Sequence, residues 1–182
     1  LIDPAPHAQA FQLGFVAAIA VYDTLIAVGL LTEDITLKWP NDVLVDGKKI
    51  SGILIEGISL AQGHQGVVVG CGINIAHHPA DTLYPVTDLA SLGVIISPLE
   101  VFLRFTIAVR EGLALYQKGD GFEAVRSRWL SFAHRKGSPI VVKDRNAEQR
   151  GLFSGLDADG RLLLDQGGHI VSVIAGDIFI ES

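Results

Sequence analysis

The chain has 182 residues, of which 49% are hydrophobic and 19% are charged, and this charged share lies below the average for soluble proteins. The composition excludes a disordered chain and predicts one domain, or one domain with a small appendage, around a well-filled core. The formal net charge is -6 and no basic run occurs, so a nucleic-acid partner held by phosphate contacts is not expected. The single cysteine excludes an internal disulfide and a multi-cysteine zinc site, and makes the reducing cytoplasm the expected compartment.

The most apolar stretch covers residues 10–31 and has nearly the length of a membrane span. Asp23 lies close to its middle, where a charge is costly in a bilayer, so we expect a buried core helix and no membrane contact. The helix is expected to begin after Pro6 and to end near Gly29. Because the chain contains no methionine, we also expect that residues upstream of Leu1 are missing from this sequence.

Four β-forming runs follow this helix, at residues 35–39, 43–45, 48–55 and 67–69. Asp46-Gly47 separates the second run from the third, and such a pair is typical of a two-residue hairpin turn because both positions need a positive φ. The fourth run is apolar at every position, which predicts a buried strand. It continues into Gly70-Cys71-Gly72-Ile73-Asn74.

The hairpin turn predicts which side chains share a face of the sheet. The expected pairs are Val45 with Lys48, Leu44 with Lys49 and Val43 with Ile50. Because side chains alternate along a strand, Asp42 then shares a face with Lys49, whereas Lys48 points to the other face. Two interpretations follow from this spacing. Asp42 and Lys49 either belong to one site or form a surface ion pair that contributes less than about 1 kcal/mol.

Two helices and a β-rich tail are expected in the second half of the chain. Residues 77–93 show little periodicity and predict a loop. A helix over residues 98–116 is indicated by apolar residues at helical spacing, namely Leu99, Phe102, Leu103, Ile107 and Leu113. A second helix over residues 122–132 has Phe122, Val125 and Trp129 on one face.

The C-terminal tail reads as a separate small β unit. Gly137-Ser138-Pro139 marks the expected boundary. Short β-forming runs at regular spacing follow it, at residues 140–142, 151–156, 162–164 and 170–173, and they predict a small β barrel packed on the first domain. We therefore expect two domains, residues 1–136 and residues 137–182.

Three motifs give the chain a family resemblance. They are Lys38-Trp39-Pro40-Asn41-Asp42, Gly47-Lys48-Lys49-Ile50-Ser51-Gly52-Ile53-Leu54 and Gly70-Cys71-Gly72-Ile73-Asn74. In order and spacing they resemble the biotin protein ligases, also called biotin–[acetyl-CoA-carboxylase] ligases, and the β tail resembles the SH3-like C-terminal domain of that family. The resemblance implies an α+β fold of the biotin/lipoate ligase type, with helices packed on a mixed or antiparallel sheet. Residues 1–136 would then be the ligase catalytic domain, without its N-terminal part, and residues 137–182 the SH3-like domain.

The resemblance also implies a two-step reaction. Biotin and ATP would form biotinyl-5′-adenylate, and a lysine of a biotin carboxyl carrier domain would then accept the biotin, with Mg²⁺ accompanying ATP. Lys49 and Lys38 would neutralise the biotin carboxylate and the α-phosphate, and Asp42 would orient the acceptor lysine or take its proton. The expected binding residues are Asn41, Gly52, Ile53, Gly70, Gly72 and Asn74, with Asn74 as the hydrogen-bond partner of adenine. No metal-binding residues are expected, and a homodimer is left open.

One loop of the family falls within the chain and another does not. Residues 77–93 occupy the place of a loop that closes over the adenylate, with Leu83 and Tyr84 as apolar clamps, although an ordinary surface loop is the alternative. The arginine- and glycine-rich loop that binds biotin in the family lies upstream of the first long helix, and no such segment occurs here. Biotin binding and adenylation are expected to require it.

Alternative interpretations remain at the level of the sequence. A lipoate or octanoate transferase of the same fold is one, and a non-catalytic relative that binds a carrier domain or an adenylate is another. Cys71 is interpreted as a small buried residue and not as a nucleophile. Trp39 belongs either to the core or to a wall of the site. His77-His78 is not expected to bind metal, because adjacent side chains on a strand point apart.

Overall fold

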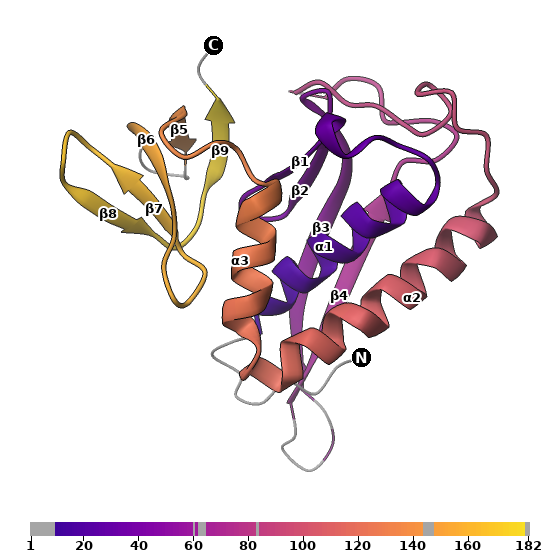
Figure 1. Cartoon of the computed structure of the whole chain (residues 1–182), viewed down its shortest axis with the longest axis horizontal. Coiled ribbons are helices and arrows are strands. Elements are labelled where there is room, and N and C mark those ends of the chain that lie inside the picture. The colour runs from indigo at the N-terminus through magenta and orange to yellow at the C-terminus, as the bar shows by residue number, and fades with distance from the viewer. Residues whose placement is uncertain (1–9, 60, 62–64, 83, 144–147, 181–182) are drawn as a thin grey trace.

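The computed structural model of the chain describes residues 10–59, 61, 65–82, 84–143 and 148–180. Its helices are α1 (Gln12–Ala27), α2 (Pro98–Tyr116) and α3 (Phe122–Phe132), and its strands are β1 (Ile35–Lys38), β2 (Asp42–Val45), β3 (Lys48–Ser59), β4 (Gln65–Ile73), β5 (Pro139–Lys143), β6 (Glu148–Leu156), β7 (Leu162–Asp165), β8 (Ile170–Val173) and β9 (Asp177–Ile180). The strands form two antiparallel sheets, in the orders β1-β2-β3-β4 and β8-β7-β6-β5-β9. The first sheet carries α1 on one face, and α2 and α3 pack on α1 (Figure 1). The predicted α+β class is confirmed.

Helix α1 is apolar on nearly all sides because α2, α3 and the first sheet surround it. Every side chain from Leu13 to Leu25 is buried except that of Asp23. The Asp23 carboxylate lies 2.6 Å from Nη2 of Arg128 on α3, so the only charge of this helix has a partner. The expected core helix is thus confirmed. In the part of the chain that the structure describes, no helix is long and apolar enough to cross a membrane.

The buried side of α2 is not the one that its apolar residues would suggest. The helix spans the predicted residues, but Leu99, Phe102, Leu103 and Ile107 are each more than half exposed. Its buried side is formed by Val101, Ala108, Gly112 and Tyr116. A small residue is needed at position 112, where α2 lies close to α1. A Cβ on Gly112 would lie only 2.9 Å from Cγ1 of Val16.

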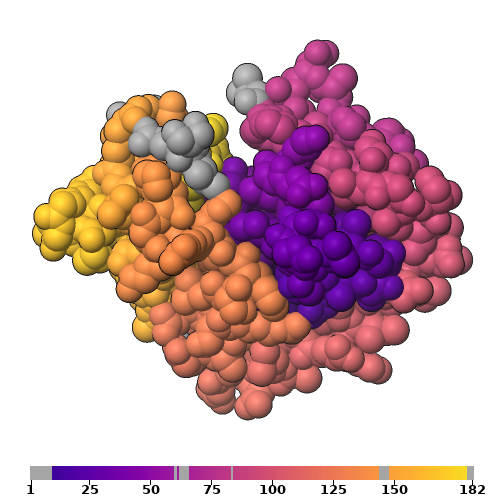
Figure 2. Space-filling view, turned by 45° about the horizontal axis from the view of Figure 1, so that its top comes forward, coloured from indigo at the N-terminus to yellow at the C-terminus, as the bar shows by residue number. Residues whose placement is uncertain are grey.

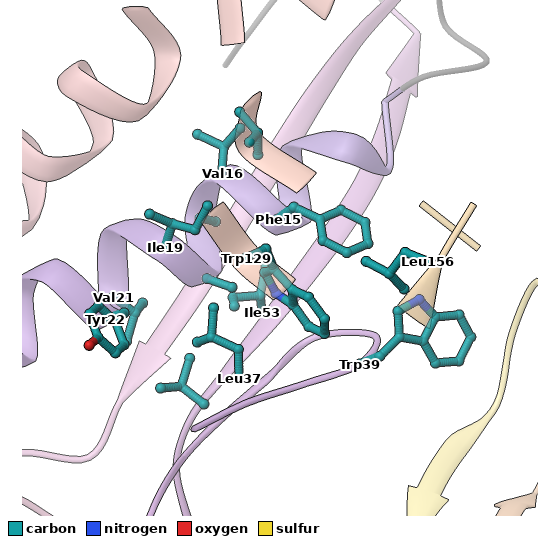
Figure 3. Packing of buried hydrophobic residues seen from close by; sticks show 14 of the residues in the cluster. Phe15, Val16, Ile19, Val21, Tyr22, Leu37, Trp39, Ile53, Trp129 and Leu156 are labelled. Atoms are coloured by element: carbon teal, nitrogen blue, oxygen red, sulfur yellow. The ribbon is translucent and has the colours of Figure 1, made fainter. Parts of the chain in front are cut away.

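The main core lies between α1, α3 and the first sheet (Figure 3). Phe15 of α1 meets Trp129 of α3 edge to face, with 5.4 Å between the ring centroids, which is a favoured aromatic geometry. Leu37 and Ile53 contribute the side chains of the sheet, and both are almost fully buried. On α3, Phe122 and Val125 share the buried face with Trp129, as predicted.

The β2–β3 hairpin contains a bulge that the sequence did not predict. Asp46-Gly47 forms the expected turn, with positive φ at both residues, and the two pairs nearest the turn are as expected. Val43, however, pairs with Ser51 and not with Ile50, because β3 carries one extra residue at this point. The predicted Val43–Ile50 pair is therefore wrong. The extra residue, Ile50, is fully buried in the core, and its burial accounts for the bulge.

The second sheet contains the four predicted strands and a fifth, β9, which pairs with β5. The sequence did not indicate this strand, because its pairing partner β5 lies far from it along the chain. β9 lies on the side of the second sheet that faces β1 (Figure 1). The division into domains at residues 136 and 137 stays a prediction.

The N-terminal and C-terminal parts of the chain are in direct contact. In Figure 2 the orange segments, which include α3, pack against the indigo N-terminal segments. The indole Nε1 of Trp39 donates a hydrogen bond to the carbonyl of Gly160 at 3.1 Å. Gly160 has a φ of 88°, and a Cβ there would lie 2.9 Å from the ring of Phe15. Arg126 of α3 also donates a hydrogen bond to the carbonyl of Leu156 at 2.7 Å. Trp39 is 4% exposed and thus belongs to the core at this junction.

His134 links the pH of the solution to the stability of this junction. It lines a small cavity with Leu37, Trp39 and Ile178, and its Nε2 is buried without a hydrogen-bond partner. Burial lowers the pKa of His134 below its ordinary value, and the charge of Lys38 lowers it further. The folded protein therefore disfavours the protonated ring, whereas the unfolded chain protonates it near pH 6.5. The stability that the neutral ring provides is present above about pH 6.5 and is lost as the pH falls through the lower folded-state pKa.

We predict that His134→Leu reduces the pH dependence of stability. The free energy of unfolding, measured by urea titration between about pH 7 and about pH 5, should fall less steeply with decreasing pH in the variant than in the wild type, because one proton fewer is taken up on unfolding. His169→Leu, which removes an exposed histidine, serves as the control and should keep the wild-type slope. Equal slopes in wild type and His134→Leu would contradict the prediction.

Candidate active site

Three charged side chains meet on the face of the first sheet that α1 does not cover. Lys38 of β1 pairs with Asp42 of β2 across the turn that contains the cis Trp39-Pro40 peptide. The Asp42 carboxylate lies 3.2 Å from Nζ of Lys38 through Oδ2 and 2.5 Å from Nζ of Lys49 through Oδ1. The structure thus brings the three predicted catalytic residues together. The pairing of Asp42 with Lys49 rather than with Lys48 is confirmed.

This cluster is not a surface ion pair. The side chains of Lys38, Asp42 and Lys49 are 15%, 8% and 22% exposed, so the second interpretation of the spacing is wrong. Removing charges from water costs free energy that their mutual attraction repays only in part. A partly buried cluster with two cations and one anion is therefore not expected to stabilise the fold by itself. Such clusters are common at functional sites.

Lys49 is held in its charged form. Burial acts to lower its pKa, but the hydrogen bond and the charge of Asp42, with a smaller contribution from Tyr84, outweigh burial and raise the pKa above its ordinary value. The ammonium group therefore stays protonated at neutral pH. Two ammonium groups against one carboxylate leave the cluster with one excess positive charge, which suits the binding of an anion.

The bulge in β3 places a glycine beside this cluster. Along a regular strand, Lys49 and Gly52 would point to opposite faces because they are three residues apart. The extra residue in β3 brings Gly52 opposite Asp42, on the side of Lys49. A Cβ at position 52 would lie 3.1 Å from both Cε and Nζ of Lys49. A side chain at this position would thus crowd the Lys49 ammonium group, which would have to shift by a few tenths of an ångström.

The segment after β4 covers the cluster. Residues 77–93 contain no helix or strand in their described part, as predicted, but they are tied to β3. The backbone of Lys49 donates to the carbonyl of Pro85 at 2.9 Å and accepts from Thr87 at 3.0 Å. The ring centroid of Tyr84 lies 5.2 Å from Nζ of Lys49 and 5.9 Å from Nζ of Lys38, within reach of cation–π attraction. Leu83, the other expected clamp, lies outside the described residues.

A cavity of about 100 Å³ opens between β3, β4 and this segment. Lys49, Gly52, Gly72, Asn74 and Tyr84 are among the residues that line it. The amide of Asn74 donates to the carbonyl of Thr87 at 2.9 Å, and its side-chain oxygen has no partner among the described residues. A Cβ on Gly72 would meet open space. The lining of the cavity thus includes a cation, Lys49, and a hydrogen-bond acceptor, the side-chain oxygen of Asn74.

Other predicted binding residues have structural partners. The side-chain amide of Asn41 donates to the carbonyl of Ile53 at 2.8 Å, and the backbone of Ile53 donates to the carbonyl of Asn41 at 2.9 Å. The side chain of Ile53 points into the core (Figure 3). Gly70 lies beside the backbone of Leu54 and is not among the residues that line the cavity. Binding roles for Asn41, Ile53 and Gly70 stay predictions.

Sequence reasoning missed one aromatic residue of the site. Phe179 of β9 lies with its ring centroid 5.9 Å from Nζ of Lys38. No pattern along the chain could have indicated this contact, because the two residues are more than a hundred positions apart and β9 itself was not predicted. Within the described ranges, no three residues of the types His, Cys, Asp and Glu are placed to hold a metal ion together.

The reactivity of Cys71 tests the packing of the first sheet against the helices, and this test does not depend on enzymatic activity. Its side chain faces the helices and lines a cavity with Leu13, Val16 and Phe105, and burial raises the pKa of the thiol to about 11. We predict that the native protein reacts with iodoacetamide at about pH 8 on the order of 100-fold more slowly than free cysteine, because so little thiolate is present. Mass spectrometry measures the rate, and protein unfolded in urea is the control. If the native protein reacted nearly as fast as free cysteine, the buried position of the Cys71 thiol would be contradicted.

Comparison with known protein families identifies both parts of the chain. Residues 3–74 match the Biotin/lipoate A/B protein ligase family, and residues 137–180 match the Biotin protein ligase C terminal domain. Among curated proteins, the biotin–[acetyl-CoA-carboxylase] ligase of Paracoccus denitrificans is 38% identical over 85% of this chain and 67% of its own length. The bifunctional ligase/repressor BirA of Bacillus subtilis is 30% identical over 92% of this chain, which spans about half, 52%, of that protein.

Solved structures agree with these matches. The apo biotin protein ligase of Aquifex aeolicus superposes with a TM-score of 0.81 and 26% identity, over 100% of this chain and 79% of that chain. The Aquifex ligase in complex with biotin and ATP gives a TM-score of 0.76 over 94% of this chain and 71% of that chain. The small C-terminal sheet is thus an SH3-like domain of the expected kind. From these matches and from the shared arrangement of its strands, the chain belongs to the biotin protein ligase family.

Proposed function

We propose that the protein is a biotin protein ligase, which activates biotin with ATP and transfers it to a lysine of a biotin carboxyl carrier domain. The observation that carries this proposal is the cluster of Lys38, Asp42 and Lys49, of which Lys49 lines a cavity together with Asn74. The relatives support it, because the Paracoccus protein is a ligase of this kind and the Aquifex ligase binds biotin and ATP. The β tail supports biotin over lipoate or octanoate, since the matching C-terminal domain is that of biotin protein ligases.

In the first step, an oxygen of the biotin carboxylate attacks the α-phosphorus of ATP, and the bond to the departing pyrophosphate breaks. Both reactants are anions and repel each other. Lys49 and Lys38 oppose this repulsion because their ammonium groups are already fixed, by Asp42, where the anions meet. The side-chain oxygen of Asn74 can accept a hydrogen bond from the amino group of adenine in the cavity that Lys49 also lines. Gly52 and Gly72 leave room for the ligand beside the backbone.

In the second step, the amine of the carrier lysine attacks the biotinyl carbonyl, and the bond to the phosphate of AMP breaks. The amine must lose a proton as the amide forms. Asp42 is the nearby carboxylate that can orient the amine and take this proton. The segment that carries Tyr84 covers the cluster, and such cover protects a mixed anhydride from water.

Mg²⁺ enters this proposal as part of the ATP complex. Asp42 is occupied by two lysines, and the described residues offer no group of carboxylates for a metal, so the ion would be carried by the phosphates of ATP, where it shields their charge. A cytoplasmic location is inferred from the need for ATP and an unmodified carrier. Homodimer formation stays open.

The choice of acyl group is tested directly. Protein expressed from its complete gene is incubated with ATP, Mg²⁺, a carrier domain and radiolabelled biotin or octanoate. We expect label on the carrier lysine from biotin only, together with release of pyrophosphate. Label from octanoate would select the transferase alternative. A protein that binds the carrier but releases no pyrophosphate would be a non-catalytic relative.

We predict that Lys49→Ala lowers the rate of adenylate formation by roughly 100- to 1,000-fold, because a preorganised charge at the reacting anions is lost. The rate is measured as pyrophosphate release in the absence of a carrier. Lys48→Ala is a matched control, since Lys48 is an exposed neighbour, and it should keep nearly the wild-type rate. Full adenylation by Lys49→Ala would remove this residue from the mechanism.

Asp42→Asn is predicted to separate the two steps. The amide keeps the shape of the side chain but cannot take a proton, so transfer to the carrier should fall further than adenylation. Adenylation is followed as pyrophosphate release, and transfer is followed in single turnovers that start from chemically prepared biotinyl-5′-adenylate. An equal loss in both steps would contradict a role for Asp42 at the acceptor amine.

A further inference from the structure

The second sheet contributes an aromatic ring to the cationic cluster of the first. β9 is the strand of the second sheet that lies nearest β1 (Figure 1), and Phe179 is one of its residues. The ring of Phe179 is 41% exposed, whereas its neighbour Ile178 is 3% exposed and packs in the junction. The ring of Phe179 is therefore not enclosed in the core, and its face is available to the charged groups beside it.

Lys38 is held less closely by Asp42 than Lys49 is. The ion-pair distances are 3.2 Å for Lys38 and 2.5 Å for Lys49. The Nζ of Lys38 also lies 5.9 Å from the ring centroid of Tyr84 and 5.9 Å from that of Phe179. The face of an aromatic ring attracts a cation within about 6 Å. Two rings on different segments therefore add to the restraint that Asp42 places on this ammonium group.

We propose that Phe179 is a positioning residue, through which the C-terminal domain holds the Lys38 ammonium group at the site of adenylate formation. The proposal rests on the function proposed above, because it assigns Lys38 to the first step. It explains why the second sheet approaches the cluster with an aromatic side chain. The domain then assists the reaction without touching the substrate, since it acts through one lysine.

The ring of Phe179 also faces Lys143 of β5, with 5.3 Å from Nζ to the ring centroid. Lys143 is half exposed and forms an ion pair with Glu148 at 3.0 Å, on the surface of the second sheet. It is distant in sequence from the cluster and has no contact with Asp42 among the described residues. Lys143 is therefore a matched control, because it contacts the ring of Phe179 as Lys38 does but is not part of the cluster around Asp42.

The experiment measures pyrophosphate release by protein expressed from its complete gene, with biotin and ATP varied in turn. Phe179→Leu, which keeps an apolar side chain but removes the ring, should lower kcat/KM for ATP about ten-fold, in the range expected for a partly desolvated cation–π contact. Phe179→Tyr should restore activity to within about two-fold of the wild type. Lys143→Gln should also stay within about two-fold.

A double-mutant cycle distinguishes positioning from a general effect on folding. If Phe179 acts through Lys38, then Phe179→Leu causes no further loss in a Lys38→Gln background. Equal losses with and without Lys38 would overturn the proposal, as would a Lys38→Gln variant with wild-type activity or a Phe179→Leu variant with wild-type activity. Thermal unfolding of each variant shows whether the fold is retained.

A second measurement does not depend on activity. Lysines are labelled by reductive methylation with ¹³C, and the signal of Lys38 is assigned by its loss in Lys38→Arg. The ring current of Phe179 should shift this signal in the wild type and in Phe179→Tyr, and the shift should be reduced in Phe179→Leu. An unchanged signal in Phe179→Leu would overturn the contact. A wild type that makes no adenylate but shows the shift would contradict the proposed function while leaving the positioning of Lys38 intact.

Discussion

The structure around the candidate site depends on one buried carboxylate that is shared by two ammonium groups. Asp42 lies at the start of β2, between Lys38 on β1 and Lys49 on β3, so the attraction extends across three adjacent strands. Because none of the three side chains is well exposed, each charge depends on the other two for compensation. An anionic substrate that enters the site meets positive charge that is already oriented, and little reorganisation is needed when charge develops during the reaction.

Much of this arrangement could be predicted from the sequence because its determinants are local. The Asp46-Gly47 turn sets the pairing of Lys49 with Leu44, and strand alternation then places Lys49 on the face of Asp42. The bulge could not be predicted in the same way. Ile50 is displaced from the regular pairing because its side chain is buried in the core, and that core is formed by helices distant in sequence. The consequence was an error of one residue in the pair of Val43.

Interactions between distant segments account for the other differences. The apolar spacing of α2 indicated a helix correctly, but the close approach of α1 selects small residues for its buried side, as Gly112 shows. β9 was missed because its partner, β5, lies far from it in the sequence. The contacts of Phe179 and Tyr84 with Lys38 likewise arise only when three separate segments are brought together. The roles of Lys38, Asp42 and Lys49 were inferred from family resemblance, and the structure adds their proximity.

The hydrogen bond between Trp39 and Gly160 has a consequence for how the protein can be divided. Trp39 stands between Lys38 and the turn that leads to Asp42, so its indole connects the second sheet to the backbone of the reactive strands. A protein truncated before β5 would expose Trp39 to water and would remove the contact of Phe179 with Lys38. The SH3-like part therefore stabilises the segment between Lys38 and Asp42 through Trp39. A protein shortened to its N-terminal part would lose this stabilising contact of its own active site.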